Sequence, residues 1–223
     1  MNNELRKISE VRIGGYSLEE IIKRHQHWIS KDCMNYKNMK ANFKGLSLTN
    51  IDFSGLNLRG ITFRDADLTG SNFTDANVSE CLFINANLTN TIFVKANMEK
   101  TIFGAHNNRN LQCNAILDNV DFSKAYCKNT VFSFCKRIRN CKFIETNLTG
   151  SKFSDIDIAE STLCNTIGEY YMSGNIWFTI FNNAKCKLVN AAIYDSEFIN
   201  YDNKYQDIEL RFYENKIYSC KFA

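Results

Sequence analysis

Large apolar residues recur at every fifth position along the first half of the chain. The run begins at Phe43 and continues without a miss to Phe103, alternating phenylalanine with leucine, valine or methionine. A smaller residue such as Ala66, Ser71 or Thr91 stands two positions before most of them, and the position between is mostly Asn, Asp, Ser or Thr. A period of five fits neither the 3.6-residue period of a helix nor the two-residue period of a strand. The chain must therefore turn after each unit of five.

Four such units close a square coil in which the small and the large residue of each unit point inward. The next coil then stacks at about the 4.8 Å spacing of hydrogen-bonded strands. Because the phenylalanines alternate with a period of ten, which divides evenly into a coil of twenty, identical side chains should stack in columns. The predicted core ladder has two opposite columns, formed by Phe43, Phe63, Phe83 and Phe103, and by Phe53, Phe73 and Phe93. The absence of proline fits this solenoid, since every coil donates backbone N–H groups to its neighbour.

The repeated units resemble those of the pentapeptide-repeat family. Residues 66–70, 86–90 and 146–150 are similar to the family's Ala-Asp/Asn-Leu-x-x unit, and the likeness extends over about residues 39–198. The resemblance implies an all-β solenoid, the right-handed quadrilateral β-helix of that family. The best-known family members resemble B-DNA in shape and bind DNA gyrase. The resemblance therefore also implies DNA mimicry and gyrase binding as one specific activity.

A helix is expected before the repeats. Ser17 and Glu20 match a capping box, and apolar residues follow at helical spacing, so residues 17–30 should form an amphipathic helix that caps the first coil. The expected organisation is an N-terminal segment (1–38), a repeat β-helix (39–198) and a terminal coil or C-terminal cap (199–223).

The five-residue register breaks in three places between Phe103 and Phe178, and a further fourteen-residue gap separates Phe198 from Phe212. Fourteen residues separate Phe103 from Leu117, which predicts a loop near 104–112. Loops on a rigid scaffold often carry function, so His106, Asn107, Asn108 and Arg109 form a candidate interaction loop, with an insertion of no function as the equal alternative. A one-residue slip precedes Ile138. The pattern blurs after Gly168 and is expected to resume with inward residues at Phe178, Phe181, Cys186, Ile193 and Phe198.

One dense cluster of cations accompanies the second break. It consists of Lys136, Arg137, Arg139 and Lys142. A solvated face is the favoured interpretation, and an anion-binding or nucleic-acid-binding patch is the alternative. Elsewhere charge is balanced, because residues 41–103 carry five Lys or Arg against six Asp or Glu and the whole chain has a formal net charge of +3. Direct nucleic-acid binding is therefore not expected.

The composition is that of a globular protein, with 44% hydrophobic and 23% charged residues. The N-terminal sequence lacks the apolar stretch of a secretory signal, and no apolar run reaches membrane-spanning length, so we expect a cytoplasmic protein without membrane contact. The nine cysteines are odd in number and never spaced C-x-x-C, which favours reduced thiols.

No set of residues indicates catalysis. His25 and His27 are two positions apart and should diverge on a helix, so we assign no metal, although a site made by Cys33 with these histidines remains open. No catalytic or cofactor-binding motif is present, and no enzyme activity is assigned. The sequence favours a non-catalytic rigid rod that binds a macromolecular partner, an unidentified protein, through its β-helix surface. The alternative is a DNA mimic that protects gyrase or another type II topoisomerase.

The C-terminal end predicts a further contact. Units resembling the repeat recur at Phe212, Ile217 and Phe222, so the chain should end on an open coil. Because open strand edges favour pairing, we expect a homodimer through this end. The alternative is a monomer in which residues 201–207 fold back over the last coil as a cap.

Overall fold

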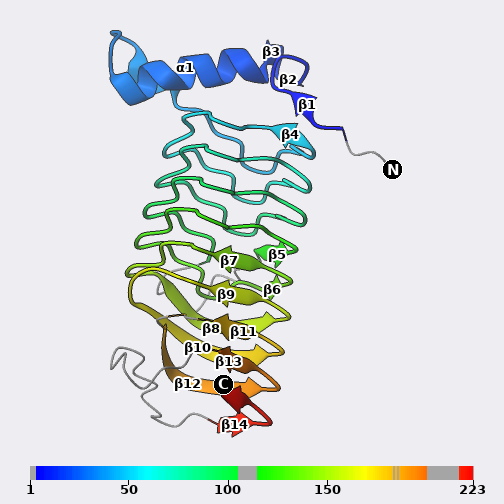
Figure 1. Ribbon diagram of the computed structural model, residues 1–223. Coiled ribbons are helices and arrows are strands. Elements are labelled where there is room, and N and C mark those ends of the chain that lie inside the picture. The colour runs from blue at the N-terminus through cyan, green and yellow to red at the C-terminus, as the bar shows by residue number, and fades with distance from the viewer. Residues whose placement is uncertain (1–3, 105–114, 183, 185, 200–215, 223) are drawn as a thin grey trace.

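The computed structural model describes residues 4–104, 115–182, 184, 186–199 and 216–222 (Figure 1). The helices are α1 (Leu18–Ser30) and the 3-10 helix η1 (Tyr36–Met39). The strands are β1 (Arg6–Lys7), β2 (Arg12–Ile13), β3 (Tyr16–Ser17), β4 (Ile51–Asp52), β5 (Ile116–Asp118), β6 (Arg137–Arg139), β7 (Lys142–Ile144), β8 (Lys152–Ala159), β9 (Thr162–Cys164), β10 (Tyr170–Trp177), β11 (Ile180–Asn182), β12 (Cys186–Tyr194), β13 (Glu197–Ile199), β14 (Lys216–Tyr218) and β15 (Lys221–Phe222). No helix in the described residues is long and apolar enough to span a membrane.

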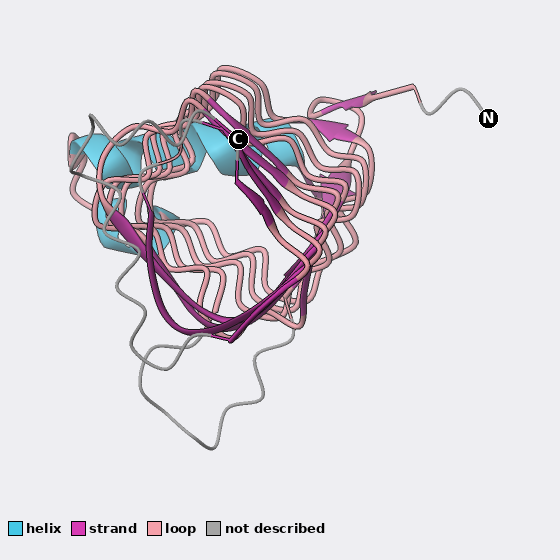
Figure 2. Ribbon diagram, turned by 60° about the horizontal axis from the view of Figure 1, so that its bottom comes forward, coloured by secondary structure: helices cyan, strands magenta, loops and turns pink. Residues whose placement is uncertain are grey.

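The chain winds into a β-solenoid whose successive coils are parallel and superimposed. In the upper coils the bridges join residues 20 apart, such as Asn42 to Thr62 and Thr62 to Leu82. Backbone bonds follow the same step, and the N–H of Phe63 donates to the carbonyl of Leu82 at 2.8 Å. In an oblique view from the end of the solenoid opposite α1, the coils lie over one another with similar outlines (Figure 2). The predicted fold class is confirmed.

Each five-residue unit turns because one residue adopts a left-handed backbone. From Phe43 to Met98 this residue follows each inward pair by two positions, and Asp75 at φ 57° is typical. Glycine, asparagine and aspartate tolerate that conformation best, which explains their recurrence there. The polar residue between the inward pair fixes the turn from the other side, since Asn72 Oδ1 accepts a hydrogen bond from the N–H of Thr74 at 3.0 Å.

The core contains the predicted phenylalanine columns, and all seven ladder residues are buried. Within a column the rings stack, with centroids 4.8 Å apart for Phe53 and Phe73 and 4.9 Å apart for Phe73 and Phe93. The two columns also touch, because Phe73 meets Phe63 edge-on at 5.8 Å. Offset stacks and edge-to-face contacts are the favoured aromatic geometries.

Small polar residues at the other inward positions satisfy their hydroxyl groups on the neighbouring coil. Ser71 Oγ donates to the carbonyl of Leu48 at 2.6 Å, and Thr101 Oγ1 donates to that of Val78 at 2.8 Å. Cysteine fills the same kind of position, and burial raises the pKa of the Cys81 thiol to about 12. Such a thiol is unreactive near neutral pH. The cysteines whose side chains the structure describes form no disulfide with one another: Cys33, Cys81, Cys127, Cys135, Cys141, Cys164 and Cys220.

The break after Phe103 is an insertion that leaves the ladder intact. Bridged residues are 20 apart at Leu82 and Ile102 but 29 apart at Ile102 and Val131. Phe103 nevertheless stacks on Phe132 at 5.0 Å. The candidate loop residues His106, Asn107, Asn108 and Arg109 lie outside the described residues. The second slip is present as well, because Asp121 bridges Lys142, 21 residues on.

Below the insertion the coils are built from longer strands in two parallel sheets. The six-stranded sheet has the order β14-β12-β10-β8-β6-β5, and the five-stranded sheet has the order β15-β13-β11-β9-β7. The coils shorten here, with Ile158 beside Ile176 and Ile176 beside Ile193. The sequence prediction that Phe178 points inward is wrong. Phe178 occupies a left-handed corner at φ 46° and is 56% exposed, while Ile176 takes the buried position.

Helix α1 lies across the first coil and closes the top of the stack (Figure 1). Ser17 caps it with the predicted capping box, in which Glu20 bonds back to the N–H of Ser17 at 2.7 Å. The helix buries Leu18, Ile22 and His25. Strand β1 pairs with β4 in parallel, which adds a second contact between this segment and the solenoid.

We predict that replacing one ladder ring destabilises the whole stack. Phe73→Ala removes a ring that contacts both neighbouring coils, so the cavity should cost about 3 to 5 kcal/mol in free energy of unfolding. The matched control is Asp75→Asn, which keeps a residue tolerant of the left-handed corner and should stay within about 0.5 kcal/mol. Denaturant unfolding of both variants measures the difference, and equal shifts would contradict the ladder assignment.

Candidate functional site

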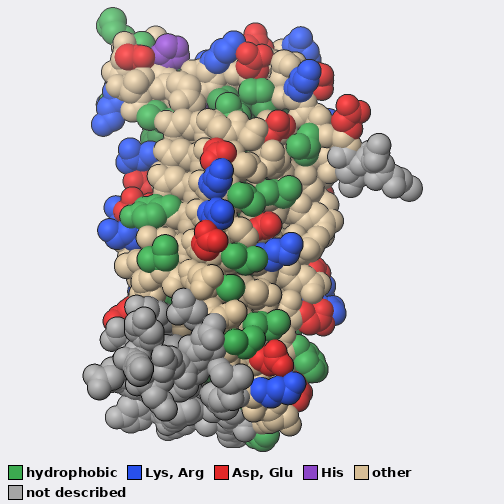
Figure 3. All heavy atoms as spheres, viewed as in Figure 1, with side chains coloured by type: hydrophobic (Ala, Val, Ile, Leu, Met, Phe, Trp, Pro, Cys, Tyr) green, Lys and Arg blue, Asp and Glu red, His purple; other side chains and the backbone are tan. Residues whose placement is uncertain are grey.

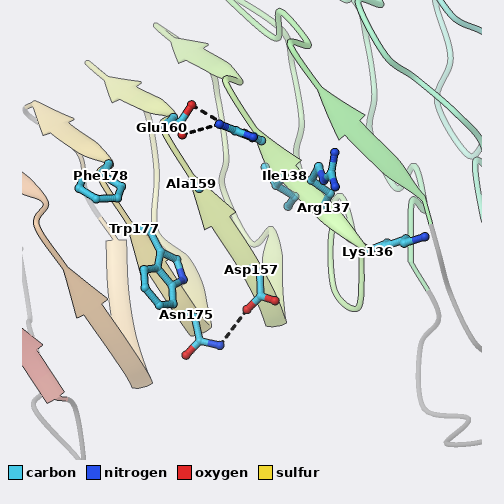
Figure 4. A pocket seen from close by; sticks show the side chains of 10 residues that line it. Lys136, Arg137, Ile138, Asp157, Ala159, Glu160, Asn175, Trp177 and Phe178 are labelled. Carbon is cyan, nitrogen blue, oxygen red and sulfur yellow. Dashed lines mark hydrogen bonds and ion pairs between the residues drawn. The ribbon is translucent and has the colours of Figure 1, made fainter.

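A groove of about 440 Å³ lies on the outer face of the six-stranded sheet, where β6, β8 and β10 run side by side (Figure 4). Alternation along each strand places one side chain inward and the next outward. Ile138, Ile158 and Ile176 are buried in the core, and their neighbours face the groove. The lining residues are Lys136, Arg137, Ile138, Arg139, Asp157, Ala159, Glu160, Asn175, Trp177 and Phe178.

The hollow arises from one small residue between two large ones. Ala159 on β8 is in register with both Arg139 on β6 and Trp177 on β10. Its methyl group leaves the space that the neighbouring guanidinium and indole enclose from either side. The corner residues Glu160 and Phe178 close the groove at the end of the strands (Figure 4).

Ion pairs fix the two arginines of the groove. Arg139 donates two hydrogen bonds to Glu160, at 2.7 Å and 3.1 Å, and this carboxylate raises the pKa of the guanidinium. Arg137 reaches Asp118 at 3.4 Å. Lys136 is exposed and forms no ion pair with any described residue. Among the described cations that line the groove, Lys136 is therefore the one left to meet a ligand.

The opposite wall is aromatic and continues down the sheet. Trp177 stacks on Tyr194 with ring centroids 4.3 Å apart, and Tyr194 stacks on Tyr218 at 4.9 Å. Trp177 is 40% exposed and Phe178 is 56% exposed. A rigid aromatic surface beside cations suits the binding of an apolar or aromatic side chain with a nearby carboxylate.

The structure brings together only part of the predicted basic cluster. Lys136, Arg137 and Arg139 line the groove, whereas Lys142 lies on β7 in the five-stranded sheet. Sequence reasoning missed the aromatic wall, because it assigned Phe178 to the core. Counting from the buried Ile176 would have placed Trp177 and Phe178 outside.

The two described histidines diverge as predicted. His25 is buried, and its Nδ1 accepts a hydrogen bond from the N–H of Ala41 at 3.2 Å. Nε2 therefore carries the proton and donates to the carbonyl of Arg59 at 3.0 Å. Burial lowers the pKa of this imidazole. His27 is exposed, and lies with Asp32 and Cys33 rather than with His25.

Solved structures of similar proteins include HetL, a pentapeptide repeat protein involved in heterocyst differentiation regulation from the cyanobacterium Nostoc. It is 16% identical over 84% of this chain and 82% of its own, with a TM-score of 0.49. A trypsin-treated form of QnrB1, a plasmid-mediated fluoroquinolone resistance protein, is 17% identical over 81% of this chain and 84% of its own, with a TM-score of 0.35. No curated protein matches the sequence.

The family comparison agrees with the coil geometry. The family model of pentapeptide repeats, in 8 copies, matches residues 39–75, 47–83, 66–104 and 115–157. These are the segments in which the inward ladder and the left-handed corners recur. The chain belongs to the pentapeptide-repeat family.

Proposed function

We propose that this protein is a non-catalytic interaction protein that binds a protein partner through the groove on its six-stranded sheet. The observation that carries the proposal is the stacked aromatic column of Trp177, Tyr194 and Tyr218, whose first member lines the groove across from Lys136 (Figure 4). Exposed aromatic side chains on a rigid scaffold lose little entropy on binding and are typical anchors of protein interfaces.

The chemistry of the groove specifies the partner segment. An aromatic or aliphatic side chain would fill the space over Ala159 and pack on Trp177. A carboxylate farther along the same segment would pair with Lys136, because Arg137 and Arg139, the other cations among the described residues that line the groove, each have a carboxylate partner already. The partner is therefore a protein segment that combines an apolar anchor with an acidic residue.

Peptide display on the purified protein tests this proposal. Selected peptides should share an apolar anchor and an acidic residue, and their dissociation constant should rise at least about tenfold in Trp177→Ala. Phe178→Asn and Phe134→Asn form a matched pair, because both phenylalanines are exposed and occupy left-handed corners, but only Phe178 lines the groove.

Phe178→Asn should weaken binding and Phe134→Asn should not. Thermal melting of each variant establishes that the fold is retained. Equal binding by both asparagine variants, or selected peptides that ignore Trp177→Ala, would refute this groove as the contact site.

For gyrase protection, the alternative that the sequence left open, we predict no effect. Charges on this surface pair between neighbouring coils, as in Arg59 with Glu80 at 2.8 Å and Lys124 with Glu145 at 3.7 Å. Both signs are interspersed on the face seen in Figure 3. A DNA mimic needs uninterrupted rows of carboxylates. Supercoiling by purified gyrase, with and without a fluoroquinolone, should be unchanged at micromolar protein, and restored supercoiling in the presence of the drug would establish the alternative.

We further propose a homodimer formed through the C-terminal end. Strands β14 and β15 are the edge strands of their sheets, so each presents one row of unpaired backbone groups among the described residues. Light scattering at tens of micromolar should give twice the 25.8 kDa mass of the chain, and deletion of residues 216–223 should return the monomer. A 25.8 kDa particle of the intact chain, or a dimer that survives the deletion, would disprove this interface.

A further inference from the structure

The turn that follows helix α1 brings three metal-binding side chains together. A ring nitrogen of His27, a carboxylate oxygen of Asp32 and the sulfur of Cys33 all lie within 4.8 Å of one another. Sequence spacing alone does not place them so, because residues five apart on a continuous helix point about 140° away from each other. Within the described part of the chain, no other group of three such side chains converges in this way.

Lys31 is the residue that produces this convergence. It ends the helix in the left-handed conformation at φ 56°, and its N–H donates to the carbonyl of His27 at 2.9 Å. The chain therefore folds back over the last helical turn. Asp32 then reaches His27, with its Oδ1 2.8 Å from Nδ1 of the imidazole.

A second sulfur approaches from η1. The Sδ of Met39 lies 3.7 Å from the Sγ of Cys33. The N–H of Tyr36 bonds to the carbonyl of Cys33 at 3.3 Å, which holds η1 against this turn. The cluster thus combines imidazole, carboxylate and thiol, with a thioether at its side.

These donor types are those of zinc sites. Zn²⁺ is bound by His nitrogen, Asp oxygen and Cys sulfur at about 2.0 to 2.3 Å in tetrahedral geometry, which separates the ligand atoms from each other by about 3.3 to 3.7 Å. The 2.8 Å hydrogen bond between His27 and Asp32 would open by roughly half an ångström. His27 and Asp32 are exposed and Cys33 is half-buried, so an ion has access and the side chains have room to adjust.

We propose that His27, Asp32 and Cys33 form a Zn²⁺ site with its fourth position beside Met39. This assignment replaces the sequence expectation of no metal, and it differs from the open sequence alternative because His25 takes no part. The ion would join the end of α1 to the segment that leads through η1 into the first coil. Its effect is to fasten the cap that covers the phenylalanine columns.

Co²⁺ serves as the spectroscopic probe for this site, and Zn²⁺ as its competitor. Titration of the full chain under reducing conditions should give one equivalent of Co²⁺ with a thiolate-to-cobalt charge-transfer band, which Zn²⁺ then abolishes. Cys33→Ser should remove the band and weaken Zn²⁺ binding more than the roughly 10- to 100-fold typical of changes outside the ligand shell. His27→Gln should weaken it comparably.

The matched control is Cys220→Ser, because Cys220 is also a half-buried free cysteine but lies at the other end of the solenoid. This variant should keep the band, the stoichiometry and the affinity. Zn²⁺ should also raise the melting temperature of the intact chain, EDTA should reverse the rise, and Cys33→Ser should show neither effect. A titration without a saturable band, or a band that survives Cys33→Ser, would overturn the proposal.

Discussion

The structure depends on keeping the coils in register. Inward rings such as Phe73 stack on the equivalent rings of the coils before and after, and backbone N–H groups donate to both neighbouring coils, as Asn72 does to Ile51 and Phe73 to Ile92. A shift by one residue would move every ring out of its column and expose it, because alternate positions face opposite sides. The repeat tolerates a long insertion between Phe103 and Ala115 because the chain returns to the same column, with Phe93 stacked on Phe122 at 5.5 Å.

The same register organises the outer surface. Ion pairs join adjacent coils, so a cation on one coil meets a carboxylate on the next, as for the corner residues Lys124 and Glu145. Such exposed pairs contribute little to stability individually. These pairs matter more for the surface, because they cancel charge between neighbouring coils. Regions of the surface therefore differ mainly in their shape and in their exposed apolar side chains. Surface shape and apolar exposure both change at the groove over Ala159. The coils become shorter there, and aromatic side chains point outward from the strands.

The two ends of the solenoid are treated differently. At the N-terminal end, α1 covers the first coil, and buried His25 bonds the backbone of both Ala41 and Arg59. At the C-terminal end of the described residues, β14 and β15 continue the pairing of the coils above as the edge strands of their sheets. A helix satisfies its own backbone groups and can cover a core, whereas a strand offers its free edge to a further strand. The proposed zinc ion would act at the end that α1 covers, and the proposed dimer contact at the opposite end.

The sequence by itself determined the coil, the ladder and the cap. Phe43 to Phe103 lie in the predicted columns because the spacing of residues within one coil fixes which side chains stack, and that spacing is constant in the chain. Ser17 and Glu20 predicted the start of α1, because a capping box involves only residues that are close together in the sequence.

The tertiary structure alone decided the groove and the metal-binding cluster. Arg139, Ala159 and Trp177 become neighbours only through coils of unequal length, and the count from sequence therefore placed Phe178 inside. His27 contacts Asp32 because Lys31 adopts a left-handed backbone conformation at the end of the helix. The pattern of apolar residues does not predict that conformation. Contacts that repeat with a constant spacing can be predicted from sequence. Sites formed where the spacing changes or where a helix ends depend on coil length and backbone conformation, which the folded structure determines.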